Sequence, residues 1–115
     1  MVAEKSYNED MKVNIKTKNF ELTDAIREYI QTKMDYLDKF VSDWEKEGGV
    51  EVNFEAAKDT NHHNKGNIYH AEANLIVPGK TIRVEKKGDD LHAAIDEVKE
   101  VLANEVKEYK EQSRP

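Results

Sequence analysis

Basic side chains are the residues of this chain whose type and spacing best suit chemistry with a ligand. Three of them follow one another through residues 22–40, and four more lie within residues 80–87: Arg27, Lys33 and Lys39, then Lys80, Arg83, Lys86 and Lys87. Such side chains bind RNA phosphates, and an RNA helix is contacted mostly through its shape and backbone, so no base-reading motif is required. The alternative is that these cations form the solvated surface of a highly charged protein. The pattern alone leaves both interpretations open.

Other reactive side chains give weaker signals. His62 and His63 are adjacent in a polar segment, whereas a metal ion needs three or four converging ligands. Glu51, Glu55 and Glu72 fall on the polar sides of predicted strands, and paired carboxylates act as acid and base only in a pocket that raises a pKa. We therefore expect no catalytic residues, no metal, no cofactor and no small-molecule substrate.

Length and composition set the outer limits. The 115 residues favour one domain, and the net charge of −6, from 24 acidic and 18 basic residues, argues against nucleic-acid binding by bulk charge. A local basic patch remains compatible with that charge. The chain has no cysteine, no apolar run as long as a membrane span and no apolar signal segment at its start. These features favour a cytoplasmic protein.

One amphipathic helix is predicted over residues 22–40, with Trp44 continuing its apolar stripe. Its apolar residues recur at spacings of three and four: Ala25, Ile26, Tyr29, Ile30, Met34, Leu37, Phe40 and Val41. Thr23 is the expected N-cap. Lys33 falls inside the apolar arc, so its charge must reach water, a carboxylate or a partner's phosphate. Glu105 falls inside the apolar arc of the last helix, and we predict a Lys33–Glu105 ion pair.

Four strands and a final helix complete the pattern. Apolar and polar residues alternate over residues 11–17, 50–56, 69–77 and 81–85, and Pro78-Gly79 predicts a hairpin turn. A helix begins after Asp89 or Asp90 and continues to about Lys110. The predicted fold is α+β, in the order β-α-β-β-β-α, with a four-stranded mixed sheet and two helices packed on one face. Residues 1–10 are expected to be a flexible arm, 11–112 a single domain and 113–115 a tail.

Two stretches resemble a known family. The segments KVNIKTKNFELTDAIREYIQTKMDYLDKF and VPGKTIRVEKKGDDLHAAIDEVKEVL are similar to the ribosome hibernation-promoting factors and ribosome-associated inhibitor A proteins, also called sigma-54 modulation proteins. The resemblance covers about residues 11 to 110 and implies the same fold. It also implies a non-enzymatic factor that binds the small ribosomal subunit and its rRNA in the decoding channel, blocks messenger and transfer RNA, and promotes hibernation. Long members add a C-terminal dimerisation domain, so this chain resembles a short member or an N-terminal domain.

The resemblance also implies which residues contact RNA. Arg27, Lys33 and Lys39 match basic positions of the family's first helix, and Tyr36 occupies a position that is basic in some members. The basic stripe of the second helix falls on positions where only Lys110 keeps the charge, with Lys99 and Lys107 as nearby substitutes. The expected RNA-binding set is Arg27, Lys33, Lys39, Lys80, Arg83, Lys86, Lys87, Lys107 and Lys110.

Two other functions remain open. The weakened stripe on the last helix favours an acidic protein-interaction module of the same fold, which would bind a partner through the open sheet face or a free strand edge. An enzyme on the same scaffold is the second alternative. Because Tyr7 and Tyr36 are the only aromatic residues expected outside, a platform for stacked bases is not predicted. The carboxylates on the open sheet face place any RNA near the helices or loop edges instead.

Overall fold

The computed structural model describes residues 11–46, 48–59 and 66–112, which form one layer of helices on one sheet. The proposed arm 1–10, the tail 113–115 and the pair His62 and His63 lie outside these ranges. The elements in chain order are β1 (Met11–Lys18), α2 (Asp24–Asp35), α3 (Asp38–Glu45), β2 (Val50–Asp59), β3 (Ile68–Val77), β4 (Lys80–Gly88) and α4 (Leu91–Gln112).

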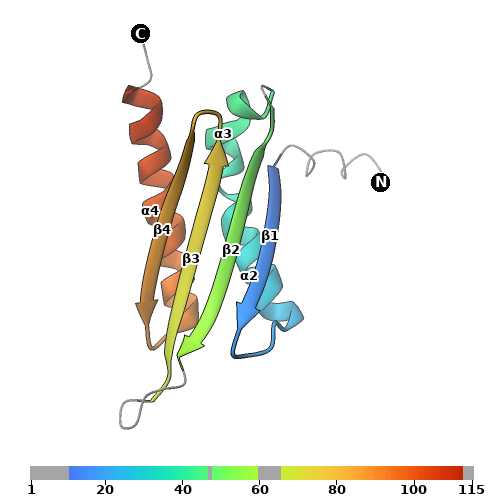
Figure 1. The fold of residues 1–115 in the computed structure, drawn as a ribbon, viewed down its shortest axis with the longest axis vertical. Coiled ribbons are helices and arrows are strands. Elements are labelled where there is room, and N and C mark those ends of the chain that lie inside the picture. The colour runs from blue at the N-terminus through green and yellow to red at the C-terminus, as the bar shows by residue number, and fades with distance from the viewer. Residues whose placement is uncertain (1–10, 47, 60–65, 113–115) are drawn as a thin grey trace.

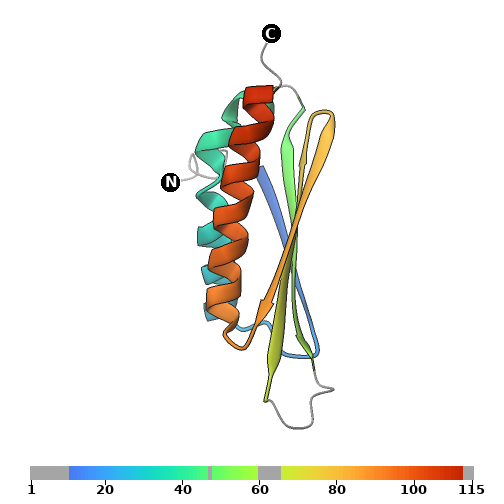
Figure 2. The ribbon, with the colours of Figure 1, turned by 90° about the vertical axis from the view of Figure 1, so that its left-hand side faces the viewer.

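The sheet has the predicted mixed topology, in the order β1-β2-β3-β4 (Figure 1). β1 pairs with β2 in parallel, and β2, β3 and β4 form an antiparallel meander. In this register Val13 lies opposite Val52, and Leu75 lies opposite Ile82. All the helices of the described chain cover the same face of the sheet (Figure 2). The α+β prediction is confirmed.

The core lies between the sheet and the helices because each element has one apolar side. Val52, Phe54 and Leu75 have at most 1% of their surface exposed, and α4 contributes the fully buried Ile95 and Leu102 to the same core. Full burial of one such side chain stabilises the fold by about 1.5–3 kcal/mol. The alternation predicted over residues 50–56 and 69–77 is therefore confirmed.

The prediction of a single helix through residues 22–40 was wrong. The chain forms two helices, α2 and α3, separated at Tyr36 and Leu37. At this joint the Leu37 N–H donates to the Met34 carbonyl at 2.9 Å, and the Phe40 N–H donates to the Leu37 carbonyl at 2.9 Å. These bonds span three residues instead of four, so the joint is a tight 3₁₀-type turn. The fold consequently has the order β-α-α-β-β-β-α.

The apolar spacing conceals this joint. Ile30, Met34, Leu37 and Val41 are all fully buried, at the spacing of a continuous helix. The backbone stays in the right-handed helical region at Tyr36 and Leu37, so the same side remains turned to the core across the joint. Ala25, which was expected on that side, is exposed.

Side chains cap the N-termini of α2 and α4 as predicted. The Thr23 Oγ1 accepts a hydrogen bond from the Ile26 N–H at 3.2 Å, and the Asp90 Oδ1 accepts one from the Ala93 N–H at 3.2 Å. Pro78 and Gly79 form the β3–β4 turn, where Gly79 has a φ of 82°. Among the residues described, no helix is long and apolar enough to cross a bilayer.

Candidate nucleic-acid interface

Aromatic rings mark the line along which α2 and α3 meet α4, which we call the helix seam. The rings are those of Tyr29, Tyr36, Phe40, Trp44 and Tyr109. Tyr36 is exposed to 39% and the other rings are half-buried. The amphipathic pattern directs all of these rings except that of Tyr36 toward the core, and the structure leaves each of them partly exposed.

Lysine ammonium groups lie over these rings. Lys39 Nζ is 4.2 Å and Lys99 Nζ is 4.3 Å from the centre of the Tyr36 ring, and Lys107 Nζ is 5.0 Å from that of Phe40. Cations are attracted to the negative face of an aromatic ring at such distances. The rings thus hold lysines from α3 and α4 on one surface.

The two ends of the helix seam repeat this arrangement. Lys33 Nζ lies 5.1 Å from the Tyr29 ring centre, and Lys80 Nζ lies 5.1 Å from that of Tyr109. Five residues of the predicted set therefore lie along the helix seam, although they come from α2, α3, α4 and β4: Lys33, Lys39, Lys80, Lys107 and Lys110.

Lys33 does not pair with Glu105, and that prediction was wrong. Its ammonium lies 3.2 Å from the Asp96 Oδ1, which also accepts a hydrogen bond from the Tyr29 hydroxyl at 2.7 Å. Glu105 is exposed. Lys33 contacts Asp96 because Asp96 lies on the side of α4 that faces α2. This carboxylate compensates the charge of the half-buried Lys33 ammonium.

This contact shifts two pKa values. The hydrogen bond to Asp96, aided by burial and by the charges of Asp96 and Asp90, raises the pKa of Tyr29 to about 12. Burial is the largest single effect on Asp96 and raises its pKa. The hydrogen bonds from Tyr29 and Lys33, with the charges of Lys33 and Lys99, outweigh it and hold the Asp96 pKa below its ordinary value.

Lys110 is also engaged within the protein. Its ammonium donates a hydrogen bond to the Phe40 carbonyl at 2.9 Å and lies 3.7 Å from the Asp43 Oδ2. The Trp44 ring lies below it, with its centre 5.3 Å away. Lys110 therefore ties the end of α4 to α3, and its charge is partly compensated.

Lys39, Lys80 and Lys107 differ from these residues. Within ranges 11–46, 48–59 and 66–112, no carboxylate forms an ion pair with any of the three. Lys99 is intermediate, because its ammonium lies 3.3 Å from the exposed Glu100 carboxylate. The uncompensated positive charge of the helix seam is thus concentrated around Tyr36 and Phe40, with Lys80 at one end.

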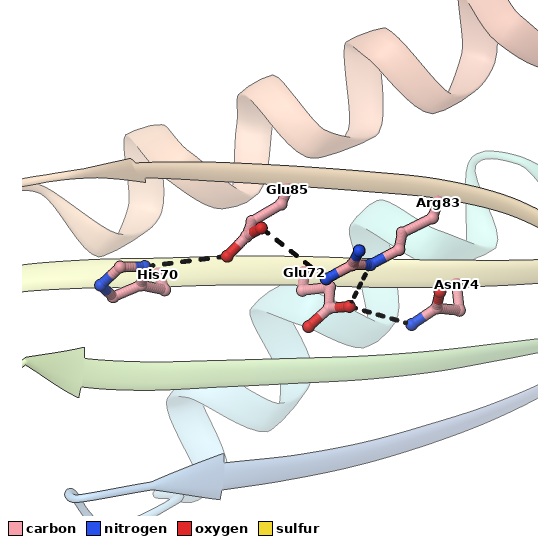
Figure 3. A network of polar contacts seen from close by, with 5 residues as sticks. All are labelled: His70, Glu72, Asn74, Arg83 and Glu85. Carbon is pink, nitrogen blue, oxygen red and sulfur yellow. Dashed lines mark hydrogen bonds and ion pairs between the residues drawn. The ribbon is translucent and has the colours of Figure 1, made fainter.

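Arg83 lies on the opposite side of the sheet. Figure 3 shows it on β4, turned toward Glu72 on β3, with a 2.5 Å distance between Arg83 Nε and the Glu72 Oε2. Arg83 also lies 3.8 Å from Glu85, and His70 Nδ1 lies 3.9 Å from the same residue. The hydrogen bond from Arg83 lowers the pKa of Glu72, and that with Glu72 raises the pKa of Arg83. The Arg83 charge is therefore neutralised locally.

The open sheet face carries the predicted carboxylates in a shallow groove. This groove of about 360 Å³ contains Glu55, Glu72 and a row of three asparagines aligned across the strands: Asn14, Asn53 and Asn74. Asn14 donates hydrogen bonds to Glu51 at 2.6 Å and to Asn53 at 2.8 Å. The described residues contain no cluster of three or more His, Cys, Asp and Glu side chains suited to a metal.

The remaining predicted cations lie apart from the Tyr36 region. Arg27 is exposed on α2, and Lys87 is exposed on β4 opposite His70. Lys86 lines a groove of about 280 Å³ together with Asp96, Glu97 and Glu100. The predicted RNA-binding set is therefore divided between the two sides of the sheet.

Sequence reasoning missed the contribution of the rings and gave Lys99 only a secondary place. Phe40 was expected inside, yet it is half-buried and carries Lys39 and Lys107 within 5.4 Å and 5.0 Å of its ring centre. A usable signal was present, because Tyr36, Lys39 and Phe40 follow one another at helical spacing. The approach of Lys99 and Lys107 from α4 had no local signal.

These features define a small α+β domain with a lysine-lined helical face and an open sheet face on which Arg83 is paired with Glu72. Residues 13–114 match the family described as "Sigma 54 modulation protein / S30EA ribosomal protein". The chain belongs to this family.

Relatives agree with this membership. A "Ribosome hibernation promotion factor" from Lactococcus lactis is 32% identical over 102 residues, covering 87% of this chain and 50% of the relative. A "Ribosome hibernation promoting factor" from Salmonella typhimurium is 31% identical over 101 residues, covering 88% of this chain and 95% of the relative. The chain thus spans half the length of the first relative and nearly all of the second.

Solved structures have the same fold. The crystal structure of the Thermus thermophilus Protein Y N-terminal domain superimposes with a TM-score of 0.65 at 30% identity, covering 84% of this chain and 98% of that one. A ribosomal subunit interface protein from Coxiella burnetii gives a TM-score of 0.67 at 19% identity, covering 87% of this chain and 98% of that one. The second likeness concerns the fold alone.

Proposed function

We propose that this chain is a non-enzymatic, cytoplasmic translation inhibitor that binds rRNA of the small ribosomal subunit near the decoding channel and promotes ribosome hibernation. Residues 11–112 would be its ribosome-binding domain. Family membership and the names of the Lactococcus and Salmonella relatives support this function.

The lysines clustered around Tyr36 and Phe40 carry the proposal. Lys39, Lys99 and Lys107 gather around two adjacent rings, Tyr36 and Phe40, whose centres are 5.5 Å apart. A protein with a net charge of −6 needs such a local concentration of cations to approach RNA. Phosphates are the complementary ligand, since lysine donates hydrogen bonds to them without reading sequence.

This geometry predicts strong salt dependence. Each lysine that neutralises a phosphate releases condensed counterions, and this changes the slope of log K against log salt by about 0.7–0.9. The loss of three such contacts would therefore flatten the slope by about 2 to 3. Arg83 on the open sheet face would contribute little, because it is already paired with Glu72.

Co-sedimentation with purified small ribosomal subunits at several salt concentrations tests the proposal. The test variant is Lys39→Gln/Lys99→Gln/Lys107→Gln, and the matched control is Lys12→Gln/Lys16→Gln/Lys18→Gln, which removes the same charge from exposed positions of β1. We expect weak binding and a flatter slope from the first variant only. Equal loss from both variants would indicate a bulk-charge effect and would reject the helix seam as the site.

The protein-interaction alternative gives a different result. If binding is insensitive to salt and to both triple variants, the ligand would be a protein partner and not rRNA. Glu51, Glu55 and Asn53 on the open sheet face would then be the next positions to substitute.

A further inference from the structure

We infer that Tyr36 is a positioning residue that gathers the ammonium groups of Lys39 and Lys99 into one site for a backbone phosphate of RNA. This inference rests on the proposed function and names the ligand of one part of the helix seam. Tyr36 itself brings no charge to the site.

The helix joint places Tyr36 for this role. Tyr36 is the C-cap of α2, and its ring is exposed to 39%, while its neighbours Met34 and Leu37 are fully buried. Lys39 approaches the ring from the first turn of α3, and Lys99 approaches it from α4. The site is thus assembled from both sides of the helix seam.

The two ammonium groups are close enough to share a ligand. Their distances from the ring centre are 4.2 Å and 4.3 Å, so the two nitrogens are at most about 8.5 Å apart. Ammonium groups with this spacing can contact the oxygens of a single phosphate or of two consecutive phosphates. Lysine prefers phosphate as a point charge, without a fixed fork geometry.

An attractive surface is needed because the two like charges repel each other. No carboxylate of the described residues pairs with Lys39, and Lys99 is paired only with Glu100 beside it on α4. The negative ring face supplies this attraction. The Lys99 side chain is only 16% exposed, so its stem is held by packing and its ammonium has few alternative positions.

The neighbouring ring continues the arrangement. The Phe40 ring packs on Tyr36 at an interplanar angle of 65° and lies near both Lys39 and Lys107. Because ammonium groups already lie over the Tyr36 ring, we assign the site to a phosphate and not to a stacked base. A base stacked on Tyr36 is an outcome that the experiment distinguishes.

Tyr36→Leu and Tyr36→Phe separate the ring from its hydroxyl. Leu keeps an apolar side chain but removes the ring, whereas Phe keeps the ring. In the free protein, NMR should show ring-current shifts of the Lys99 side-chain methylenes that disappear in Tyr36→Leu and persist in Tyr36→Phe. Those of Lys39 should decrease in Tyr36→Leu but not disappear, because Lys39 also lies near the Phe40 ring. Urea unfolding of each variant checks that the fold remains intact.

Binding is then measured with two probes, purified small ribosomal subunits and a short oligouridylate. We expect Tyr36→Leu to weaken binding by about threefold, the size of one or two exposed cation–ring contacts, and Tyr36→Phe to restore it. In a Lys39→Gln/Lys99→Gln background, Tyr36→Leu should have no further effect. A further loss in that background would mean that the ring itself contacts a base, and this would overturn the inference.

The two proposals fail separately. If subunits do not bind but the oligouridylate shifts the Lys39 and Lys99 side chains together in the wild type only, the ribosomal function fails and the phosphate site stands. If subunits bind and Tyr36→Leu changes neither affinity nor the lysine shifts, Tyr36 has no positioning role. If free inorganic phosphate alone reproduces the oligouridylate effect at equal concentration, the site is a simple anion site and not one for RNA.

Discussion

The Lys33 ammonium lies 3.2 Å from the Asp96 carboxylate and thereby connects α2 to α4. Asp96 Oδ1 also accepts a hydrogen bond from the Tyr29 hydroxyl, so this one oxygen contacts two side chains of α2. Because this pairing compensates the Lys33 charge, the cations of the helix seam without an ion pair to the described residues are Lys39 and Lys107, near Tyr36 and Phe40, and Lys80 at one end. The ion pair thus influences both the packing of the helix layer and the position of the basic surface.

The Tyr29 hydrogen bond should contribute measurably to stability. We expect Tyr29→Phe to lower the free energy of unfolding by about 1 kcal/mol, below the usual range for a bond to a charged group because Asp96 is partly exposed. Urea unfolding measures this. Tyr36→Phe is the matched control, since its hydroxyl has no hydrogen bond to the described residues. An equal loss in both variants would contradict the assignment.

Acid should destabilise the protein through Asp96 and Glu72. The pKa of each carboxyl is lower in the folded protein than its ordinary value of 3.8 or 4.5. Their stabilisation is therefore present above those ordinary values and is lost as the pH falls through the lower folded values. Urea midpoints measured from pH 6 to pH 2 should fall in this window. The fall should be smaller in Asp96→Asn, and an unchanged pH profile in that variant would reject the role of Asp96.

Tyr29 should titrate late in alkali. Its pKa is raised from 10.0 to about 12, so its contribution to stability is fully present below pH 10 and is lost as the pH rises toward 12. Tyrosinate absorbance should show one of the five tyrosines ionising near pH 12. Asp96→Asn should move this step toward 10. A titration that is identical in wild type and variant would contradict the hydrogen bond.

Removal of Asp96 should also free Lys33 for RNA. We expect Asp96→Asn to bind small ribosomal subunits about two- to threefold more tightly at low salt, with a slope steeper by up to about 0.9. Glu108→Gln is the control, because it removes the same charge from an exposed position of α4 with no ion pair among the described residues. Equal gains in the two variants would show that only net charge matters.

The helix joint should depend on Leu37. Leu37 is fully buried where α2 ends and α3 begins, so Leu37→Ala leaves a cavity under the joint. We expect a loss of about 3 kcal/mol in the free energy of unfolding. Ser42→Ala, at an exposed position of α3, should change stability by less than about 0.5 kcal/mol. A loss below about 1 kcal/mol for Leu37→Ala would mean that the joint collapses to fill the space.

Most of the fold could be predicted because burial has a clear period in this chain. Val50, Val52, Phe54 and Ala56 alternate with polar residues on β2, and the structure buries all four. The N-caps Thr23 and Asp90 were equally predictable, since an N-cap requires only a side-chain oxygen just before a helix. The helix joint could not be predicted from the sequence, because the buried residues keep a helical spacing across it.

The candidate site was predictable only in part. The sequence by itself determined which residues carry charge, which sides of the elements are apolar and how the elements form two layers, because these properties depend on residue type and local spacing. Only the tertiary structure decided that Asp96, and not Glu105, meets Lys33 and that Lys99 joins Lys39 at Tyr36. Such pairings depend on how far α4 is shifted and rotated against α2 and α3, and this is set by packing of the whole core against the sheet.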